Sequence, residues 1–437
     1  MPQALQNNTA AVSEFFSGKR ILILGFGREG RSSYAFLRGI FPNVALGIAD
    51  AREIERPDAN CRMHCGENYF SAMAEYDIVM KSPGIPFVNV KVPRGVQITC
   101  QTDIFLRFAS CKTIGVTGTK GKTTTSTLIY EMLKASGIKA KLAGNMGLPV
   151  LDDWQAAQDC DIVFVLELSS HQLEFTDASP QIAVWTNFYP EHLDHYATGY
   201  SGYLNAKLNI LKHQKPEDYY VHSTVQKLED FLGSLYPQGR PCPVDAPNAL
   251  PYQISNRLKG RHNLINVALA AQAASLLGAT GEGIARAAGE FKGTAHRMEP
   301  IGCFAGITFV DDCIATVPVA ALAAIDALPE CKTLIFGGQD RGIDYEPFCL
   351  ALQQTGLRTL IAMPDTGHKL AGRLKEFCAD KKIIVAADMP EAVKAAFENT
   401  KPGETCLLSP AAPSYNVYRD FEEKAEHFQS LIRAYKG

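Results

Sequence analysis

The stretch GVTGTKGKTTTSTLIYEML, Gly115 to Leu133, places a glycine-rich loop between a short apolar strand and a long helical segment. A strict phosphate-binding loop, GxxxxGKS/T, would have its first glycine at residue 116, which is Val116. The glycines stand instead at residues 115, 118 and 121, and Lys122 and Thr123 follow them. Backbone N–H groups of such a loop can face phosphate, with the lysine on the β- and γ-phosphates and the hydroxyl on Mg²⁺. The stretch therefore predicts a variant loop that binds ATP or GTP, and the alternative is a purely structural turn.

The order of strand, glycine turn and helix occurs again on both sides of this loop. It opens KRILILGFGREGRSSYAFLRGI (Lys19 to Ile40), and a later region contains the strand-like runs GITFVDD (Gly306 to Asp312), KTLIFGG (Lys332 to Gly338) and KIIVAAD (Lys382 to Asp388). Strands that alternate with helices predict an α/β fold with parallel sheets covered on both faces. At roughly 150 residues per domain, the length suggests three domains, which we place at 1–100, 101–297 and 298–437. The proline-rich stretch 236–251 is expected to be a surface loop.

Composition and charge exclude several classes of protein. The formal net charge is -3, so no global basic field attracts nucleic acid or anionic lipid. The N-terminus lacks a basic start followed by an apolar run, and no apolar segment reaches the roughly 20 residues that span a bilayer. The 12 cysteines include no CxxC pair, and those in apolar runs, such as Cys303 and Cys406, are expected to be buried and reduced. We therefore expect a cytoplasmic protein.

A second glycine-rich loop, GFGREG (Gly25 to Gly30), lies between a strand and a helix near the N-terminus. It matches GxGxxG, and Asp50 follows Gly30 at the end of the next strand, where an acid can reach a ribose hydroxyl. The pattern predicts a site for a dinucleotide or a nucleotide-sugar diphosphate, and the alternative is a tight turn with packing glycines. KSPGIP (Lys81 to Pro86) ends a third strand and either adds a phosphate or sugar contact or is a turn fixed by its prolines.

The variant loop GTKGKTTT resembles that of the Mur ligase family, which builds the peptide of bacterial peptidoglycan, and that of the related folylpolyglutamate synthetases. Further stretches match the family in order along nearly the whole chain: ELSSHQLE (Glu167 to Glu174), TNFYPEHLDHY (Thr186 to Tyr196), AKLNIL (Ala206 to Leu211), LKGRHNLINVALA (Leu258 to Ala270), AHRME (Ala295 to Glu299) and SPAAPSYNVYRDFEEKAEHF (Ser409 to Phe428). The short first domain with GxGxxG, together with GNMG (Gly144 to Gly147), is most similar to the members that add glutamate to UDP-N-acetylmuramoyl-L-alanine. Folylpolyglutamate synthetases lack that first domain.

The resemblance implies a fold and a reaction. The fold is a Rossmann-like N-terminal domain that binds the UDP-substrate, a central P-loop ATPase-like domain and a Rossmann-like C-terminal domain that binds glutamate. ATP would phosphorylate the substrate carboxylate, and the glutamate amine would attack the acyl phosphate to form an amide. The implied cofactors are ATP and Mg²⁺, at two metal sites. The implied partners are the two substrates, with no nucleic acid, no membrane and a monomeric chain.

The family also implies roles for residues of the central domain and its hinge. The implied catalytic residues are Lys122, His192, Lys207 and Arg297. The residues implied to bind ATP are Gly118, Thr119, Lys120, Gly121, Lys122, Thr123, Thr124, Asn263, Asn266, Arg297 and Asp312. The metal ligands are Thr123, Glu167, His192 and, if it is carbamylated, Lys207.

The residues themselves leave these roles open. Glu167, at the end of a buried strand, is either a metal ligand or a paired core acid. His192, with Asp194 and His195, is a possible metal site or part of a solvated loop. Lys207 alone would be a surface lysine. Asn263, in the GRHN segment, and Asn266, three residues later, could simply cap a helix.

The substrate residues implied by the family lie in the first and third domains and beside the central loop. The residues implied to bind the UDP-substrate are Gly27, Arg28, Glu29, Asp50, Arg52, Ser82 and Asn145. The residues implied to bind glutamate are Thr316, Arg341, Ser414 and Phe421. Glu29 replaces a small hydroxyl residue of the family, so its role in holding UDP is open. Lys120 replaces an asparagine that many relatives carry, and it either adds charge near the phosphates or points to solvent.

The third domain departs from the family pattern in the run DDCIATVP, Asp311 to Pro318. Ile314 and Val317 stand where the DSKATN-like run has lysine and asparagine. Arg341 stands where some relatives have lysine, which keeps the positive charge and adds a bidentate fork for a carboxylate. The sequence therefore favours D-glutamate as the added amino acid and keeps L-glutamate as the alternative.

Proteins of other classes fit the sequence less well. An NAD-dependent oxidoreductase built on the first glycine loop would leave Lys122 and Glu167 without a role. A regulatory nucleotide switch would hydrolyse nucleotide without forming an amide. A serine hydrolase based on SSHQ (Ser169 to Gln172) lacks the GxSxG elbow.

Overall fold

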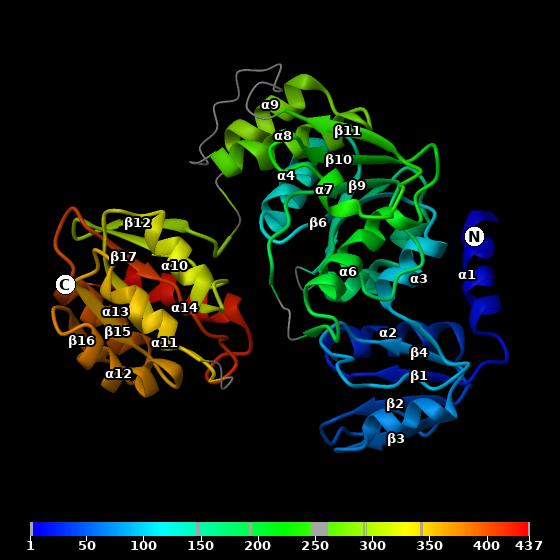
Figure 1. The fold of residues 1–437 in the computed structure, drawn as a ribbon, viewed down its shortest axis with the longest axis horizontal. Helices are drawn as coiled ribbons and strands as arrows, with labels where there is room; N and C mark the ends of the chain where they lie inside the picture. Colours follow the sequence, from blue (N-terminus) through cyan, green and yellow to red (C-terminus); the bar gives the residue numbers. More distant parts are fainter. Residues whose placement is uncertain are drawn as a thin grey trace. The chain divides into compact units, whose positions relative to one another are not determined.

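The computed structural model describes residues 3–145, 149–191, 195–245, 261–291, 293, 295–340 and 344–435. The chain forms two compact units, Met1–Phe291 and Lys292–Gly437. Within the described residues, three sheets of parallel strands alternate with helices, and one edge strand is antiparallel (Figure 1). The predicted α/β fold is confirmed, whereas the domain limits at residues 100 and 297 stay predictions.

The first sheet has the strand order β3-β2-β1-β4-β5 and is parallel throughout. Its elements are α1 (Gln3–Phe16), β1 (Ile21–Leu24), α2 (Arg28–Ile40), β2 (Leu46–Asp50), β3 (Cys61–Cys65), the 3₁₀ helix η1 (Tyr69–Glu75), β4 (Ile78–Lys81), β5 (Gln97–Thr99) and α3 (Gln101–Phe108). Strands β1 and β2 are buried along their whole length, as apolar parallel strands covered on both faces are. At the carboxyl edge of this sheet, Gly25 and Ser82 follow their strands and Asp50 ends β2.

The second sheet has the order β11-β10-β9-β6-β8-β7 and is also parallel. Its elements are β6 (Lys112–Thr117), α4 (Lys122–Ala135), β7 (Ala140–Gly144), η2 (Val150–Asp153), η3 (Ala156–Gln158), β8 (Val163–Glu167), α5 (Ser170–Leu173), β9 (Ile182–Trp185), α6 (Tyr200–Lys212), β10 (Tyr219–Ser223), α7 (Glu229–Leu232), β11 (Arg240–Val244), α8 (Arg261–Ser275) and α9 (Gly281–Glu290). In β8, Val163 and Val165 pack with α4, α8 and α9, whereas Phe164 and Leu166 pack on the opposite face. Because both faces of the strand are covered, β8 is apolar from Val163 to Leu166.

The third sheet has the order β12-β13-β17-β14-β15-β16, and β12 is its antiparallel edge. Its elements are β12 (Glu299–Phe304), β13 (Ile307–Asp311), α10 (Pro318–Asp326), β14 (Cys331–Phe336), α11 (Glu346–Gln353), β15 (Thr359–Ala362), α12 (Thr366–Phe377), β16 (Lys382–Val385), α13 (Met389–Asn399), β17 (Thr405–Leu408) and α14 (Phe421–Ala434). In β14, Leu334 and Phe336 pack with α10, α11 and α12, and Ile335 packs with α13 and α14.

The first two sheets share one apolar core. A single cluster of buried side chains includes Ile23 and Ile48 of the first sheet and Phe164 and Trp185 of the second. Burying an aliphatic or aromatic side chain of this kind stabilises a fold by roughly 1.5–3 kcal/mol. The continuous core explains why residues 1–291 form one unit although they contain two sheets.

Two expectations about the chain are wrong. The stretch 236–251 is not entirely loop, because its residues Arg240–Val244 form β11. Proline is tolerated there because β11 lies at the edge of its sheet, where Pro241 and Pro243 need not donate to a neighbouring strand. Cys303 is exposed although Cys406 is buried as expected, and all the cysteines are free thiols.

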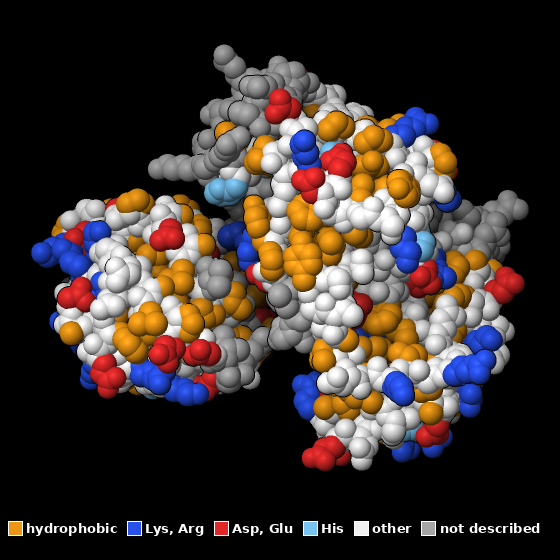
Figure 2. Space-filling view, in the orientation of Figure 1, with side chains coloured by type: hydrophobic (Ala, Val, Ile, Leu, Met, Phe, Trp, Pro, Cys, Tyr) orange, Lys and Arg blue, Asp and Glu red, His pale blue; other side chains and the backbone are white. Residues whose placement is uncertain are grey.

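Figure 2 shows basic and acidic side chains interspersed over the visible face of each unit, in keeping with the small net charge of -3. None of the helices in the described part of the chain has the length and apolar character that a bilayer crossing requires.

Candidate active site

The glycine-rich loop follows β6 and leads directly into α4. Gly118 and Gly121 have φ angles of 147° and 82°, which only glycine adopts readily. An added Cβ would lie 1.9 Å from Thr186 Oγ1 at Gly118 and 2.6 Å from Asn266 Oδ1 at Gly121. The shifted glycine spacing therefore serves the backbone turn and the close approach of two neighbouring segments. Thr123 and Thr124 lie in the first turn of α4, where helical N–H groups lack partners within the helix.

Two lysines converge on the carbonyls of this loop. Lys122 Nζ donates to Gly118 O and Thr119 O, both at 3.1 Å. Lys207 Nζ donates to Gly118 O at 2.8 Å, and its residue is only 1% exposed. Burial, followed by the positive charge of Lys122, holds the pKa of Lys207 well below its ordinary value. The expectation of a surface lysine is wrong, because α6 packs against β6 with Lys207 on its inner face.

A cavity of about 240 Å³ opens beside the two lysines. Its walls come from α4, α5, α6 and the segments after β7 and β9, and the lining residues are Lys122, Asn145, Ser169, Ser170, His171, Glu191, Tyr203 and Lys207. Three of these, Lys122, Asn145 and Lys207, are residues that the sequence predicts for the site. The structure therefore brings together the lysine predicted to bind phosphate, a buried amine and the amide predicted to contact the substrate.

Glu167 ends β8 next to this cavity and is almost fully buried. Its Oε1 accepts a hydrogen bond of 2.8 Å from Asn145 Nδ2. Its Oε2 is buried and has no hydrogen-bond partner among the described residues. A buried carboxylate oxygen without a donor is costly unless a cation binds it. Glu167 thus fits Mg²⁺, a cation that prefers oxygen ligands.

The first glycine loop lies at the carboxyl edge of the first sheet. An added Cβ at Gly30 would lie 2.0 Å from Gly25 O, so helix α2 packs closely on the turn. Ser82 Oγ donates to Gly25 O at 2.8 Å. Asp50 Oδ2 accepts from Phe26 N at 2.8 Å, and Oδ1 accepts from Arg52 N at 2.9 Å. Burial raises the pKa of Asp50, but these hydrogen bonds and the Arg52 charge lower it overall, so the carboxylate is ionised.

The short helix α5 connects the first glycine loop to the cavity. Gln172 Nε2 donates to Glu29 Oε1 at 2.9 Å, while Ser170 and His171 of the same helix line the cavity. Burial raises the pKa of Glu29. Lys81, just before Ser82, forms an ion pair of 3.4 Å with Glu174 at the other end of α5. Glu29 therefore lies where elements of the first and second sheets meet.

In the C-terminal unit, Asp312 follows β13 and is buried. Ser409 Oγ donates to Asp312 Oδ2 at 2.8 Å, and burial raises the pKa of this carboxyl to about 6. His296 Nδ1 lies 2.8 Å from Asp311 Oδ2, and this contact raises the pKa of His296. Arg297 Nε is buried without a hydrogen-bond partner in the described part of the chain.

The predicted glutamate residues of the C-terminal unit lie on separate segments. Ser414 is buried, and its Oγ has no hydrogen-bond partner within the described ranges. Thr316 lies just before α10, and Phe421 is the first residue of α14. Two of the predicted site residues, His192 and Arg341, lie outside the described residues. Asn263 and Asn266 lie on α8, where Asn266 touches the glycine-rich loop.

Several cavity residues were not predicted from the sequence. Ser169, His171, Glu191 and Tyr203 all line the cavity. The first two belong to the SSHQ stretch, whose place between β8 and the cavity only the fold reveals. Tyr203 offers no sequence signal, since its hydroxyl lies 3.1 Å from Thr119 Oγ1 through tertiary packing alone.

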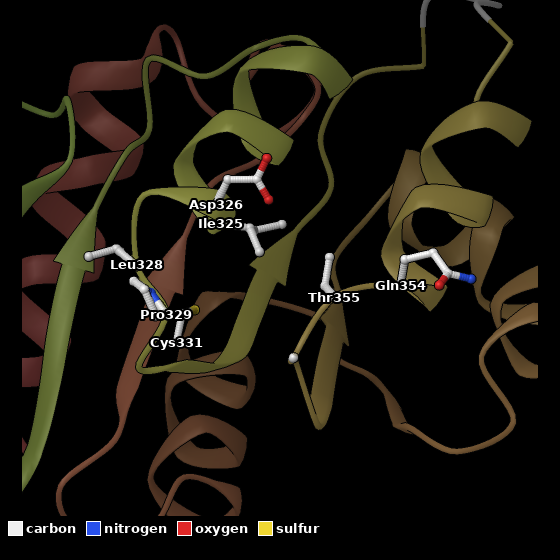
Figure 3. Close-up of a pocket in the computed structure, with 8 residues that line it drawn as sticks. Ile325, Asp326, Leu328, Pro329, Cys331, Gln354 and Thr355 are labelled. Atoms are coloured by element: carbon white, nitrogen blue, oxygen red, sulfur yellow. The ribbon is translucent and has the colours of Figure 1, made fainter. Parts of the chain in front are cut away.

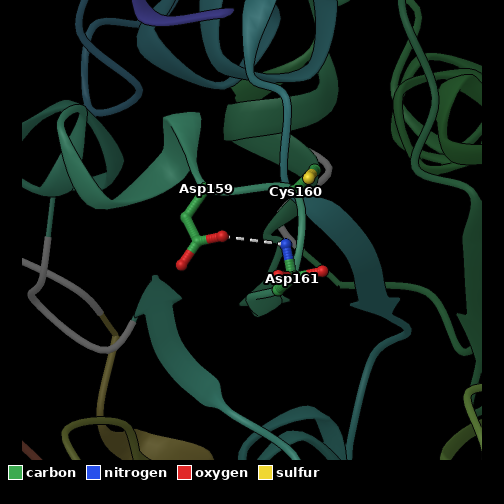
Figure 4. Close-up of side chains that lie close together, drawn as sticks. All are labelled: Asp159, Cys160 and Asp161. Atoms are coloured by element: carbon green, nitrogen blue, oxygen red, sulfur yellow. Dashed lines mark hydrogen bonds between the residues drawn. The ribbon is translucent and has the colours of Figure 1, made fainter. Parts of the chain in front are cut away.

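Two other groupings lie apart from this cavity. A pocket of about 230 Å³ between the end of α10 and the turn after α11 has one carboxylate, Asp326, and no basic side chain, so it lacks phosphate-binding chemistry (Figure 3). Asp159, Cys160 and Asp161 cluster on an exposed turn, where Asp161 N donates to Asp159 Oδ1 at 3.0 Å (Figure 4). That hydrogen bond is typical of a local aspartate turn.

Comparison with known families gives two matches. The Mur ligase middle domain matches residues 116–238, which contain the glycine-rich loop and the cavity. The Mur ligase, glutamate ligase domain matches residues 296–412 of the C-terminal unit.

Two curated relatives differ in the amino acid that their names specify. UDP-N-acetylmuramoylalanine--D-glutamate ligase of Symbiobacterium thermophilum is 36% identical over 396 residues, which cover 84% of this chain and 86% of the relative. UDP-N-acetylmuramoyl-L-alanine--L-glutamate ligase of a Micromonospora species is 34% identical over 451 residues, which cover 96% of this chain and 98% of the relative.

Solved structures share the fold at low sequence identity. UDP-N-acetylmuramate-alanine ligase of Thermotoga maritima has a TM-score of 0.58 and 19% identity, and covers 96% of this chain and 100% of that one. MurF ligase of the same organism, in complex with ADP, has a TM-score of 0.56 and 18% identity, and covers 99% of each chain.

Proposed function

This chain belongs to the Mur ligase family, and we propose that it joins glutamate to UDP-N-acetylmuramoyl-L-alanine with ATP, in the synthesis of peptidoglycan precursors. The strongest support is the cavity in which Lys122 of the glycine-rich loop and the buried Lys207 lie beside Asn145. The cavity would combine a lysine that binds phosphate with a place for the reacting carboxylate. Phosphorylation gives that carboxylate a leaving group, which the glutamate amine then displaces.

The central loop would hold the ATP phosphates, and Lys122 would leave its loop carbonyls to bridge the β- and γ-phosphates. Thr123, Glu167 and His192 would ligate Mg²⁺ at two sites. Mg²⁺ held there would neutralise the crowded phosphate oxygens. The low pKa of Lys207 favours the neutral amine, which is the form that reacts with CO₂, so carbamylation would add a carboxylate beside the metal.

The nucleotide-linked substrate would extend from the first glycine loop into the cavity. Gly27, Arg28, Asp50, Arg52 and Ser82 would hold its UDP, with Glu29 shaping the loop, and Asn145 would contact its muramoyl end. Asn263 and Asn266 would flank the adenine of ATP, Asp312 its ribose and Arg297 its γ-phosphate. Thr316, Arg341, Ser414 and Phe421 would receive glutamate.

L-glutamate is a second candidate for the added amino acid. A relative named for L-glutamate matches nearly the whole chain, and Ile314 and Val317 alter the run before α10. We retain D-glutamate as the first candidate. The protein would act in the cytoplasm as a monomer, without nucleic acid or membrane partners.

The test is an assay of purified protein with ATP, Mg²⁺ and UDP-N-acetylmuramoyl-L-alanine, run with D- and L-glutamate side by side. Phosphate release should require glutamate, and mass spectrometry should detect the amide product. Phosphate release without the product would indicate a nucleotide switch instead. If the protein oxidised a reduced nicotinamide cofactor, detected as a change in absorbance, that result would instead support the NAD-dependent oxidoreductase.

A further inference from the structure

Lys120 and Glu191 form an ion pair at the rim of the cavity. Lys120 Nζ donates to Glu191 Oε1 at 2.6 Å, and the two side chains are 50% and 26% exposed. Lys120 belongs to the glycine-rich loop, and Glu191 lines the cavity from the segment after β9. Lys120 is thus paired with an acid of the same site.

The backbone of Lys120 is held in place. Lys120 N donates to Asn187 Oδ1 at 2.9 Å, and Thr186 Oγ1 donates to Lys120 O at 2.7 Å. Thr119 N donates to Asn187 O at 2.9 Å, and Tyr189 N donates to Thr119 Oγ1 at 2.9 Å. These bonds join the loop to residues 186–189, so the Lys120 side chain can change its partner without a movement of its own backbone.

Glu191 is an acid in a site that also holds lysines. It pairs with Lys120, it lines the cavity together with Lys122 and Lys207, and the charges of Lys122, Glu191, Glu167 and Lys120 all act on Lys207. Ion pairs as exposed as this one are weak. A nucleotide phosphate carries more negative charge than one carboxylate and forms stronger charge-assisted bonds with lysine.

We propose that Glu191 is a built-in competitor of nucleotide phosphate for the side chain of Lys120. Without nucleotide, the carboxylate neutralises Lys120 and limits its repulsion with Lys122, the other charged lysine of the loop. When nucleotide binds, Lys120 transfers from Glu191 to a phosphate oxygen, and the carboxylate turns toward solvent. This inference rests on the nucleotide-binding part of the proposed function and adds Glu191 as a residue that sets nucleotide affinity.

The test is a double-mutant cycle on ADP binding, measured by calorimetry in EDTA so that no metal contributes. Glu191→Gln keeps the shape of the side chain and should strengthen ADP binding roughly 1.5-fold to fivefold, since Lys120 no longer needs to be released. Lys120→Met should weaken binding. In the Lys120→Met protein, Glu191→Gln should have no further effect.

Lys134 and Glu131 provide a matched control, because they form an ion pair of similar exposure on the same helix that Lys122 begins. Glu131→Gln should leave ADP binding unchanged. Equal effects of Glu191→Gln with and without Lys120, or weaker ADP binding in Glu191→Gln, would overturn the inference. If the wild-type protein binds ADP and makes the amide but the cycle shows no coupling, the inference fails and the proposed function stands. A wild-type protein that binds no nucleotide would reject both.

Discussion

Single side chains at the site owe their chemistry to burial and to close neighbours. Lys207 has a low pKa because α6 places it inside the protein next to Lys122. Glu167 Oε2 is poised for a cation because its strand ends inside the fold and Asn145 occupies only the other oxygen. Both properties come from packing, and either would vanish if the same residue were on the surface.

Lys122→Ala tests the division of labour between the two glycine loops. Loss of the charge that would bridge the phosphates under the proposed function should lower kcat by about 100-fold or more. Binding of UDP-N-acetylmuramoyl-L-alanine, measured by calorimetry, should be unchanged, because its UDP would be held by the first loop. Loss of both turnover and UDP-substrate binding would show that the two loops do not act separately.

The contact between His296 and Asp311 predicts a pH dependence of local stability. Because Asp311 raises the pKa of His296 above the usual value of about 6.5, the stabilisation is complete below that pH and is lost as pH rises through the raised pKa. His296→Gln should therefore lower the local unfolding free energy by about 1–2 kcal/mol at pH 6 and by less at pH 9. Hydrogen exchange of β13 measures the difference, after correction for the intrinsic pH dependence of exchange. A cost that is equal at both pH values would contradict the assignment.

At the scale of elements, the glycine-rich loop depends on space as much as on donors. Thr186 and Asn266, from two different segments, approach glycine positions where no side chain fits. Helix α5 is equally constrained, since one of its residues bonds the first glycine loop while others line the cavity.

Gly118→Ala should weaken nucleotide binding by more than about tenfold, because the new methyl group would displace Thr186 or the loop itself. Gly39→Ala is the matched control, since Gly39 lies in helix α2 with no atom within 4 Å of an added Cβ. That variant should bind nucleotide normally. Binding can be followed with a fluorescent ATP analogue, and normal affinity in Gly118→Ala would show that the loop tolerates a side chain.

At the scale of the whole molecule, the chain has two units but three sheets. The first two sheets cannot separate without exposing a shared core that includes Ile23 and Trp185. The third sheet has clusters of its own on both faces. We therefore expect the two sheets that share a core to unfold together, and the third sheet to unfold as a separate cooperative unit.

Calorimetry of the full chain should therefore show two unfolding transitions, and a protein of residues 1–291 should show only one of them. Its UDP-substrate affinity should match that of the full chain, because the first loop and α5 are both present. Three resolved transitions in the full chain, or separate melting of the first sheet, would contradict the shared core.

The sequence predicts features that depend on local chemistry. The glycine spacing, the strands that end in Thr117 and Glu167, and the α/β fold follow from patterns within about 20 residues. The burial of Lys207 and the cavity position of Tyr203 could not be predicted, because both depend on how α6 packs against a strand about 90 residues earlier. Arg240–Val244 was misassigned because prolines indicate loops unless the edge position of a strand is known.

Helix α5 has a consequence for substrate size. It fixes the separation between the first glycine loop and the cavity, since Gln172 bonds Glu29 while its neighbour His171 lines the cavity within one packed unit. Under the proposed function, the two ends of that separation hold the nucleotide and the reacting carboxylate of a single molecule. On that premise, the fixed separation would select substrates by length. A precursor already one amino acid longer would carry its carboxylate past Lys122, and chain growth would stop after a single addition.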